Sequence, residues 1–280
     1  MDLGLDGKVV MVTGGSDGLG RALCHRLIQE GASVALCARD RERLSATADE
    51  LRALAAALRA PEDETRARRT DPGALGATPV LADPCDVTSA DDLRQFVERA
   101  VERFGRIDGL VNNAGRSAGK PVAETTDADW EEDLLLKLHA AVRLTRLVLP
   151  HMTRPGGAIV NVLAIAAKTP GAGSGPSSVS RAAGMALTKA LSKELGPDGI
   201  RANAVLIGLI ESGQWERVAA TRGVAVEDLY LRMAVDAGIP LGRVGRAAEF
   251  ADTVSYLLSS RASYVTGAAL NLDGGLCAAV

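Results

Sequence analysis

The sequence predicts one α/β domain built on a doubly wound parallel sheet with helices on both faces. Short apolar runs such as "KVVMVT" and "SVALCA" alternate with helical patterns along the 280 residues, as repeated βαβ units require. A hydrophobic content of 47% is enough to cover both faces of such a sheet. No linker-like composition divides the chain, so we expect residues 1–280 to form a single domain.

Seven strands can be placed in order along the chain. Each is a run of apolar or β-branched residues that Gly, Pro or Asp interrupts at its ends. The expected strands are 8–13, 33–38, 78–86, 108–114, 157–163, 200–206 and 267–275. Apolar residues at three- and four-residue spacing predict helices between them, among which are 19–31, 41–60, 136–153 and 176–195.

Two segments depart from this alternation. Residues 60–77 are rich in charge, Pro and Gly and cannot bury much apolar surface, which predicts a surface insertion. Residues 211–238 form a helical excursion that is longer than a plain crossover between two strands needs. We expect this second segment to be a substrate lid over a mainly hydrophobic small molecule, with apolar walls from Trp215, Tyr230, Leu231 and Met233.

Charge and composition argue against several classes of protein. The formal net charge of -3 and the pI near 5.7 provide no basic surface for nucleic acid, and we interpret the run "RARR" at 66–69 as a solvated loop. The first residues lack the basic and long apolar segments of a signal peptide or a membrane span. The four cysteines have no metal-ligand or redox spacing. We therefore expect a cytoplasmic protein that binds neither nucleic acid, membrane nor metal.

A glycine-rich turn joins the first expected strand to the first expected helix. "VTGGSDGLG" places Gly14, Gly18 and Gly20 at this junction. Glycines allow a ligand to approach the backbone closely, and the N–H groups at the start of a helix attract phosphate. The context of strand, turn and helix makes a dinucleotide site the favoured interpretation, although glycines alone also build ordinary tight turns.

With "CDV" at 85–87, "NNAG" at 112–115 and the closing "SYVTGAALNLDGG", the chain resembles the short-chain dehydrogenase/reductase family, of the 3-oxoacyl carrier-protein reductase type. The resemblance covers nearly the whole chain and implies a Rossmann-type fold. It implies that Asp86 and Val87 contact adenine, that Asn113 stabilises the sheet beside the adenosine ribose, and that Ile210 and Ser212 face the nicotinamide. Other cofactor-binding positions implied by the resemblance are Ser16, Leu19, Ala114, Gly115 and Gly208.

The end of the second strand, "LCARDRERL", bears on which dinucleotide is bound. An NAD site has a carboxylate there for the ribose hydroxyls, whereas an NADP site has a guanidinium for the 2′-phosphate. Ala38 stands at the acid position and Arg39 follows it, so NADP(H) is favoured. Asp17 and Asp40 favour NAD(H) instead, which stays an alternative, and Arg39 is also compatible with a solvated charge at a helix start.

The catalytic positions of the family are all substituted here. The resemblance places Lys137 at the usual Asn, Ala164 at the Ser, Ser177 at the Tyr and Arg181 at the Lys. Ser177 is shorter than a tyrosine and a far weaker acid than a phenol, and Ala164 has no hydroxyl to polarise a carbonyl. The resemblance implies that Arg181 can bind the nicotinamide ribose as the usual lysine does, but a guanidinium does not release a proton.

Lys137 is the most informative of these replacements because "LLLKLHAAV" surrounds it with apolar residues. If Lys137 lies beside Arg181 in a partly dry pocket, repulsion and desolvation lower its pKa, and it can act as acid, base or nucleophile. The alternative is that Lys137 extends along its helix to Asp133 or to a cofactor phosphate and performs no chemistry.

Three hypotheses of function are compatible with these residues. The first is an NADP(H)-dependent oxidoreductase that acts on a hydrophobic carbonyl, alcohol or enone by non-standard proton transfer. The second is a non-redox enzyme of the same fold, such as an isomerase, dehydratase or cyclase, and the third is a non-catalytic partner protein. The resemblance and the apolar helices 136–153 and 176–195 predict a homo-oligomer, either a tetramer or a dimer.

Overall fold

A seven-stranded parallel sheet forms the centre of the computed structural model, which describes residues 2–59 and 78–280. The surface insertion expected at 60–77 lies outside the described residues. The strand order is β3-β2-β1-β4-β6-β8-β9. The strands are β1 (Val9–Thr13), β2 (Ser33–Ala38), β3 (Val80–Pro84), β4 (Gly109–Asn112), β6 (Ala158–Ala164), β8 (Arg201–Ile207) and β9 (Ala269–Leu272). Each lies within one of the predicted strands or extends at most one residue beyond it, and the doubly wound Rossmann-type fold is confirmed.

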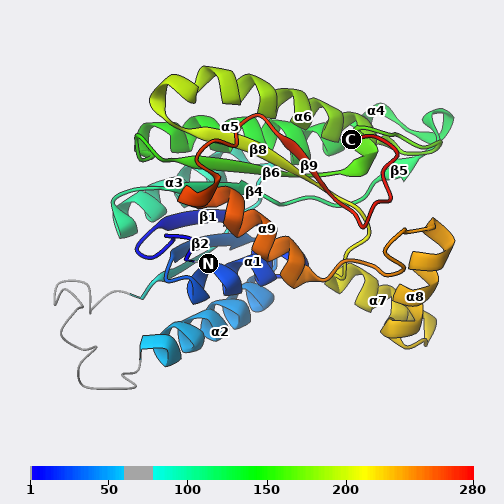
Figure 1. The fold of residues 1–280 in the computed structure, drawn as a ribbon, viewed down its shortest axis with the longest axis horizontal. Helices are drawn as coiled ribbons and strands as arrows, with labels where there is room; N and C mark the ends of the chain where they lie inside the picture. The colour runs from blue at the N-terminus through cyan, green and yellow to red at the C-terminus, as the bar shows by residue number, and fades with distance from the viewer. Residues whose placement is uncertain (1, 60–77) are drawn as a thin grey trace.

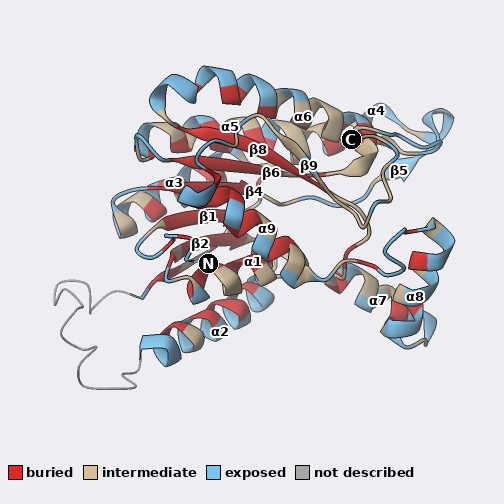
Figure 2. Ribbon diagram, in the orientation of Figure 1, coloured by how far each residue is buried: buried red, intermediate tan, exposed pale blue. Residues whose placement is uncertain are grey.

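Helices cover both faces of this sheet (Figure 1). One layer contains α1 (Gly18–Gln29), α2 (Arg41–Arg59) and α9 (Ala247–Leu258). The other contains α3 (Ala90–Phe104), α4 (Asp127–Leu134), α5 (Ala140–Val148) and α6 (Ser177–Glu194). Successive residues of a strand point to opposite faces, so Val10 and Val12 pack with the first layer while Met11 packs with the second. Figure 2 shows the resulting pattern of buried strands and helices exposed on their outer sides.

The order of the strands places a crevice beside β1. The chain moves outward from β1 to β2 and β3, then returns to β4 on the opposite side of β1. The loops that follow β1 and β4 therefore diverge, and ligands of open α/β sheets bind at this point. Thr13 ties the two loops together, because its hydroxyl accepts hydrogen bonds from the backbone N–H groups of Asn113 and Ala114, both at 3.0 Å.

Three local features shape the same edge of the sheet. Between α4 and α5 the helix predicted at 136–153 contains a π-helical turn, Leu135–His139, at Lys137. A short antiparallel pair, β5 (Gly119–Lys120) and β7 (Gly175–Pro176), precedes the start of α6. The expected lid consists of α7 (Gly213–Arg222) and α8 (Val226–Ala237), which stand apart from the layered body (Figure 1).

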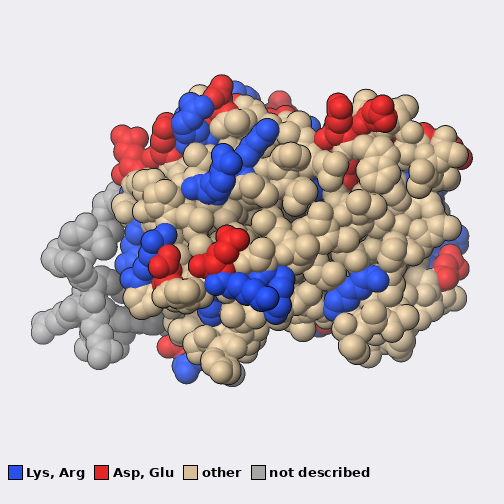
Figure 3. All heavy atoms as spheres, turned by 90° about the horizontal axis from the view of Figure 1, so that it is seen from above, with Lys and Arg blue, Asp and Glu red and all other residues tan. Residues whose placement is uncertain are grey.

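The surface provides no continuous basic face in the view of Figure 3, where acidic and basic side chains are interspersed on a mostly uncharged surface. No helix within residues 2–59 and 78–280 is long and apolar enough to cross a membrane. Within the same ranges, no group of three or more His, Cys, Asp or Glu side chains is arranged to hold a metal ion.

Candidate active site

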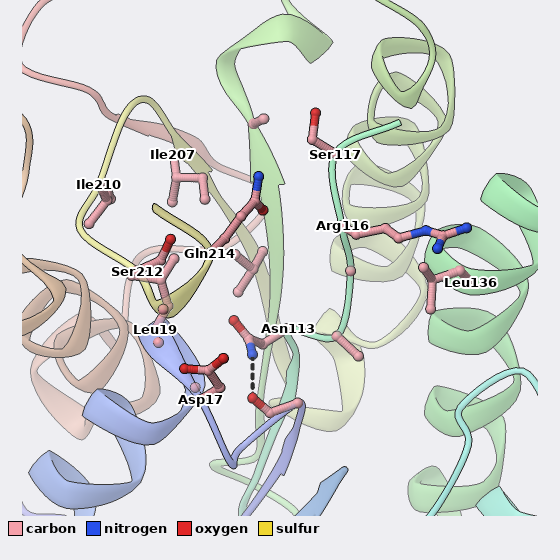
Figure 4. A pocket seen from close by; sticks show the side chains of 18 of the residues that line it. Asp17, Leu19, Asn113, Arg116, Ser117, Leu136, Ile207, Ile210, Ser212 and Gln214 are labelled. Carbon is pink, nitrogen blue, oxygen red and sulfur yellow. Dashed lines mark hydrogen bonds between the residues drawn. The ribbon is translucent and has the colours of Figure 1, made fainter. Parts of the chain in front are cut away.

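A cavity of about 940 Å³ opens at the carboxyl edge of the sheet, at the crevice beside β1 (Figure 4). Its volume is at the upper end of the range for small-molecule and cofactor pockets. It brings together fourteen of the positions predicted from the sequence: Gly14, Ser16, Gly18, Leu19, Gly20, Arg39, Val87, Asn113, Ala114, Gly115, Arg181, Gly208, Ile210 and Ser212. Two replaced catalytic positions, Ala164 and Ser177, line it as well.

The glycine-rich turn has the backbone that the sequence predicts for a phosphate-binding loop. Gly14 and Gly18 have φ values of +66° and +50°, which side chains rarely adopt. A Cβ on Gly20 would overlap the carbonyl oxygen of Gly14 and lie 2.7 Å from Nδ2 of Asn113. The side chain of Asp17, the N-cap residue of α1, makes no capping hydrogen bond within the described chain. The first N–H groups of α1 are therefore left for an anion in the cavity.

The positions expected at the adenosine differ in where their side chains lie. Asn113 donates hydrogen bonds to the carbonyl oxygens of Thr13, at 2.9 Å, and Gly14, at 3.2 Å, which matches the stabilising role that the resemblance implies (Figure 4). Val87 lines the cavity. Asp86 does not line it: its carboxylate accepts hydrogen bonds from the backbone and hydroxyl of Thr88, at 2.9 Å and 2.7 Å. Contact of Asp86 with adenine stays a prediction.

Arginines surround the end of the cavity next to β2. Arg39 is exposed at its rim, and Arg43, which sequence reasoning missed, forms ion pairs with Asp40 at 2.6 Å and with Asp17 at 3.2 Å. Arg217 from α7 contacts Asp17 at 2.8 Å. The two carboxylates that favour NAD(H) in the sequence are thus paired with guanidinium groups. Their pairing could not be predicted from a motif, because Asp17 and Arg217 are 200 residues apart.

The opposite end of the cavity contains the replaced catalytic positions. Ala164 ends β6, and Ser177 is the first residue of α6, whose N-terminus faces the cavity. The Arg181 guanidinium donates a long hydrogen bond of 3.4 Å to the carbonyl oxygen of Val162, and burial lowers its pKa. Ala164 and Ser177, which stand where the family has a serine and a tyrosine, are both small residues that line the cavity.

Lys137 lies behind Ser177 and forms no part of the lining of this cavity. Its side chain is only 5% exposed, and its ammonium pairs with the carboxylate of Asp133, which is 2% exposed. The ammonium also donates a 2.7 Å hydrogen bond to Oγ of Ser177. Ser180 fixes the other oxygen of Asp133 with a hydrogen bond of 2.6 Å. The predicted alternative of an ion pair with Asp133 is thus present, together with a contact to a cavity residue that was not predicted.

The pKa of Lys137 is lowered, mainly because burial disfavours the charged ammonium. The hydrogen bond and charge of Asp133 act in the opposite direction, whereas the nearby cations Arg181 and Arg116 lower the pKa further. The direction expected from the sequence is therefore correct. The main cause differs, because desolvation contributes more than the repulsion from Arg181, and Asp133 counteracts part of the lowering.

The remaining lid residues contribute unequally. Of the expected apolar walls, Trp215 lines the cavity and Tyr230, Leu231 and Met233 do not: Leu231 is 61% exposed and Met233 packs against Ala234, Ile239 and Val244. The hydroxyl of Tyr230 accepts a 3.3 Å hydrogen bond from the backbone of Ser212 and so fixes the start of α7.

Comparisons with known proteins agree with this geometry. A family model described as short chain dehydrogenase matches residues 8–70, and one described as enoyl-(acyl carrier protein) reductase matches residues 56–277. The chain is 32% identical over 273 residues to a 3-oxoacyl-(acyl-carrier-protein) reductase of Thermotoga maritima, covering 97% of this chain and 98% of that protein.

Two solved structures are similar over nearly the full length. A short chain oxidoreductase from Pseudomonas aeruginosa PAO1, solved with NADPH and described as containing an atypical catalytic center, is 35% identical with a TM-score of 0.86 and coverage of 98% of both chains. The L-sorbose reductase of Gluconobacter frateurii, complexed with NADPH and L-sorbose, is 32% identical with a TM-score of 0.87 and coverage of 100% of both chains. The chain belongs to the short-chain dehydrogenase/reductase family.

Proposed function

We propose that this protein is an NADP(H)-dependent oxidoreductase that reduces a hydrophobic carbonyl or enone compound, or oxidises the corresponding alcohol. The observation that carries the proposal is the 2.7 Å hydrogen bond from the buried ammonium of Lys137 to Oγ of Ser177, a residue that lines the cavity. It provides a route for a proton at the end of the cavity where the family has its tyrosine. The bound cofactor would supply the hydride.

The residues fit a phosphorylated dinucleotide. Gly14 and Gly18 have positive φ values, a Cβ on Gly20 would overlap the carbonyl oxygen of Gly14, and these glycines and the N-terminus of α1 line the cavity. Arg39, Arg43 and Arg217 line the end next to β2, where a 2′-phosphate needs cationic partners. The NADPH complexes of the two structural relatives support the same assignment. NAD(H) stays the alternative.

The proton would move in two linked transfers during carbonyl reduction. Lys137 donates to Oγ of Ser177, so the O–H of Ser177 would be free to donate to a substrate in the cavity. As the carbonyl oxygen becomes an alkoxide, Ser177 gives it this proton and takes one from Lys137. Ser177 is a weak acid alone, but a lysine with a lowered pKa behind it makes the transfer favourable.

Charge would replace the missing polarising hydroxyl. Ala164 offers no donor, but the cavity is bordered by the guanidinium of Arg181 and by the N-terminus of α6 at Ser177. Both favour negative charge developing on the substrate oxygen. Arg181 can also hold the nicotinamide ribose, as the family resemblance implies. Asp133 would position Lys137 and keep it protonated.

The test is a search for turnover with a matched variant. The purified protein is incubated with NADPH and a panel of hydrophobic ketones and enones, and loss of the reduced nicotinamide absorbance is followed beside Lys137→Met. Turnover by the unmodified protein and its loss in the variant are expected. The redox assignment would be rejected if the protein bound NADPH but neither oxidised it with any ketone or enone nor reduced NADP⁺ with the matching alcohols. That result would favour a non-redox enzyme or a partner protein.

We also infer that the protein is a homo-oligomer, a tetramer or a dimer, that associates through the α5 and α6 helices. Leu144 and Leu191 are buried within the subunit itself, but Leu147 and Met185 are only half-buried and Val179 is 49% exposed. These partly exposed residues supply apolar surface for a symmetry mate. Light scattering at micromolar concentration should give a mass above that of the 29.0 kDa chain, and a monomer would contradict the inference.

A further inference from the structure

Asp17 of the glycine-rich turn connects three elements that are distant in the sequence. One of its carboxylate oxygens, Oδ2, contacts Nη1 of Arg43 in α2 at 3.2 Å and Nη1 of Arg217 in α7 at 2.8 Å. All three side chains line the cavity. The carboxylate therefore gathers two guanidinium groups at the end of the cavity where Arg39 also lies.

The lid and the glycine-rich turn are in close contact at this point (Figure 4). A Cβ on Gly213, the first residue of α7, would collide with the Asp17 carboxylate, and a Cβ on Gly18 would lie 3.4 Å from the side chain of Ser212. Glycine at 213 thus allows the N-terminus of α7 to approach the cofactor loop. The positive end of that helix and Arg217 in its second turn both lie beside the Asp17 carboxylate.

We propose that Arg217 of the lid, together with Arg43, binds the 2′-phosphate of the cofactor and determines the preference for NADP(H). The proposal rests on the proposed function, since it requires an adenine dinucleotide in the cavity. It assigns a role in cofactor specificity to a segment that the sequence indicates only as a substrate lid.

Arg43 and Arg217 can exchange their ion pairs with Asp17 for contacts with a phosphate. The side chains of Arg43, Arg217 and Asp17 are 51%, 60% and 38% exposed, and pairs at such exposure contribute little to stability. A phosphate dianion offers more charge and more acceptor oxygens than one carboxylate oxygen. Arg43 and Arg217 can therefore leave their exposed ion pairs with Asp17 at little cost and turn to a phosphate. The cofactor phosphate would then hold α7 against the cofactor loop.

Binding measurements on single variants test the assignment. NADPH and NADH affinities are measured by nicotinamide fluorescence for the unmodified protein and for Arg39→Ala, Arg43→Ala, Arg217→Ala and Arg222→Ala. Arg222 is the matched control because it is exposed in the same helix and does not line the cavity. Arg217→Ala and Arg43→Ala should each weaken NADPH binding about tenfold and leave NADH binding unchanged, whereas Arg222→Ala changes neither.

A second measurement reports on the lid directly. The chain has two tryptophans, Trp130 and Trp215, and Trp215 lies in α7 on the cavity wall. In a Trp130→Phe background, adenosine 2′,5′-bisphosphate should change the fluorescence of Trp215, whereas adenosine 5′-monophosphate, which lacks the 2′-phosphate, should change it much less at equal concentration. Arg217→Ala should remove the difference between the two nucleotides.

The outcomes separate the two proposals. If the unmodified protein binds neither NADPH nor NADH, the proposed function fails. If it prefers NADPH and Arg217→Ala keeps the same ratio of NADH to NADPH dissociation constants as Arg222→Ala, the role of Arg217 is wrong while the proposed function stands. If Arg217→Ala weakened NADH binding as much as NADPH binding, the role of Arg217 in specificity would also be wrong, because the substitution would then affect the whole site.

Discussion

The two ends of the cavity differ in the chemical groups that form them and in how far those groups are buried. At the end next to β2, backbone N–H groups, glycines and exposed arginines form the site, and the ion pairs there are solvent-accessible. At the other end Ser177 lines the cavity, and behind it Lys137 and Asp133 form with it a cluster of buried polar side chains. Exposed charge pairs rearrange at little cost, whereas breaking a buried pair leaves a charge without a partner. The first end is therefore suited to recognise a charged ligand, and the second to hold a proton at a fixed place.

The largest expected effect is at the first end, where Gly20→Ala should abolish NADPH binding. The added Cβ overlaps the carbonyl oxygen of Gly14 and presses on Asn113, so the turn must open. Gly171→Ala is the control, because a Cβ there meets no heavy atom within 4 Å. Fluorescence titration measures binding, and a thermal melt is expected to show a loss of about 1–3 kcal/mol of stability. NADPH affinity equal to that of Gly171→Ala would show that the backbone of this turn does not form the site.

At the second end, Lys137→Met should lower turnover about 10²–10⁴-fold and leave NADPH affinity within about threefold. Methionine has a similar length but cannot donate to Ser177, so the relay loses its proton source. Lys120→Met provides a control, since Lys120 pairs with Asp129 at 2.8 Å outside the cavity. Steady-state kinetics and titration measure the two quantities. Unchanged turnover in Lys137→Met would make this residue a packing residue.

The difference between the ends also explains what the sequence could predict. Glycines at 14, 18 and 20 act through the backbone of one short segment, so a local motif was sufficient to locate that end. The positions of the strands along the chain followed from similar local patterns, whereas the other cofactor-binding positions were implied by the family resemblance. The contact of Lys137 with Ser177 joins residues 40 apart, and that of Asp17 with Arg217 joins residues 200 apart. Such contacts depend on how helices pack, which periodicity does not encode.

Arg39→Ala should have a smaller effect, confined to the first end. Loss of one charge-assisted hydrogen bond to a 2′-phosphate should weaken NADPH binding about tenfold, or about 1.4 kcal/mol, and leave NADH binding unchanged. Arg39 is exposed, so the fold should keep its melting temperature. Titration with both nucleotides measures the ratio of affinities. Equal NADH and NADPH affinities in the unmodified protein would contradict the assignment before any variant is made.

Asp133→Asn should have the smallest effect on kcat/KM at neutral pH. The shift in its pH profile is the sharpest test of the second end of the cavity. In the proposed carbonyl reduction Lys137 would act as an acid, so kcat/KM should fall as pH rises through the lysine pKa, which burial places below its ordinary value. The Asp133 carboxylate raises that pKa, and asparagine keeps its shape without its charge. The midpoint of Asp133→Asn should therefore move to lower pH, with the rate at the acidic plateau retained. Asp129→Asn is the control, as Asp129 lies one turn earlier in α4 and caps the helix without contacting Lys137. A midpoint that stays in place while the whole profile falls would show that Asp133 only supports the helix and does not set the protonation of Lys137.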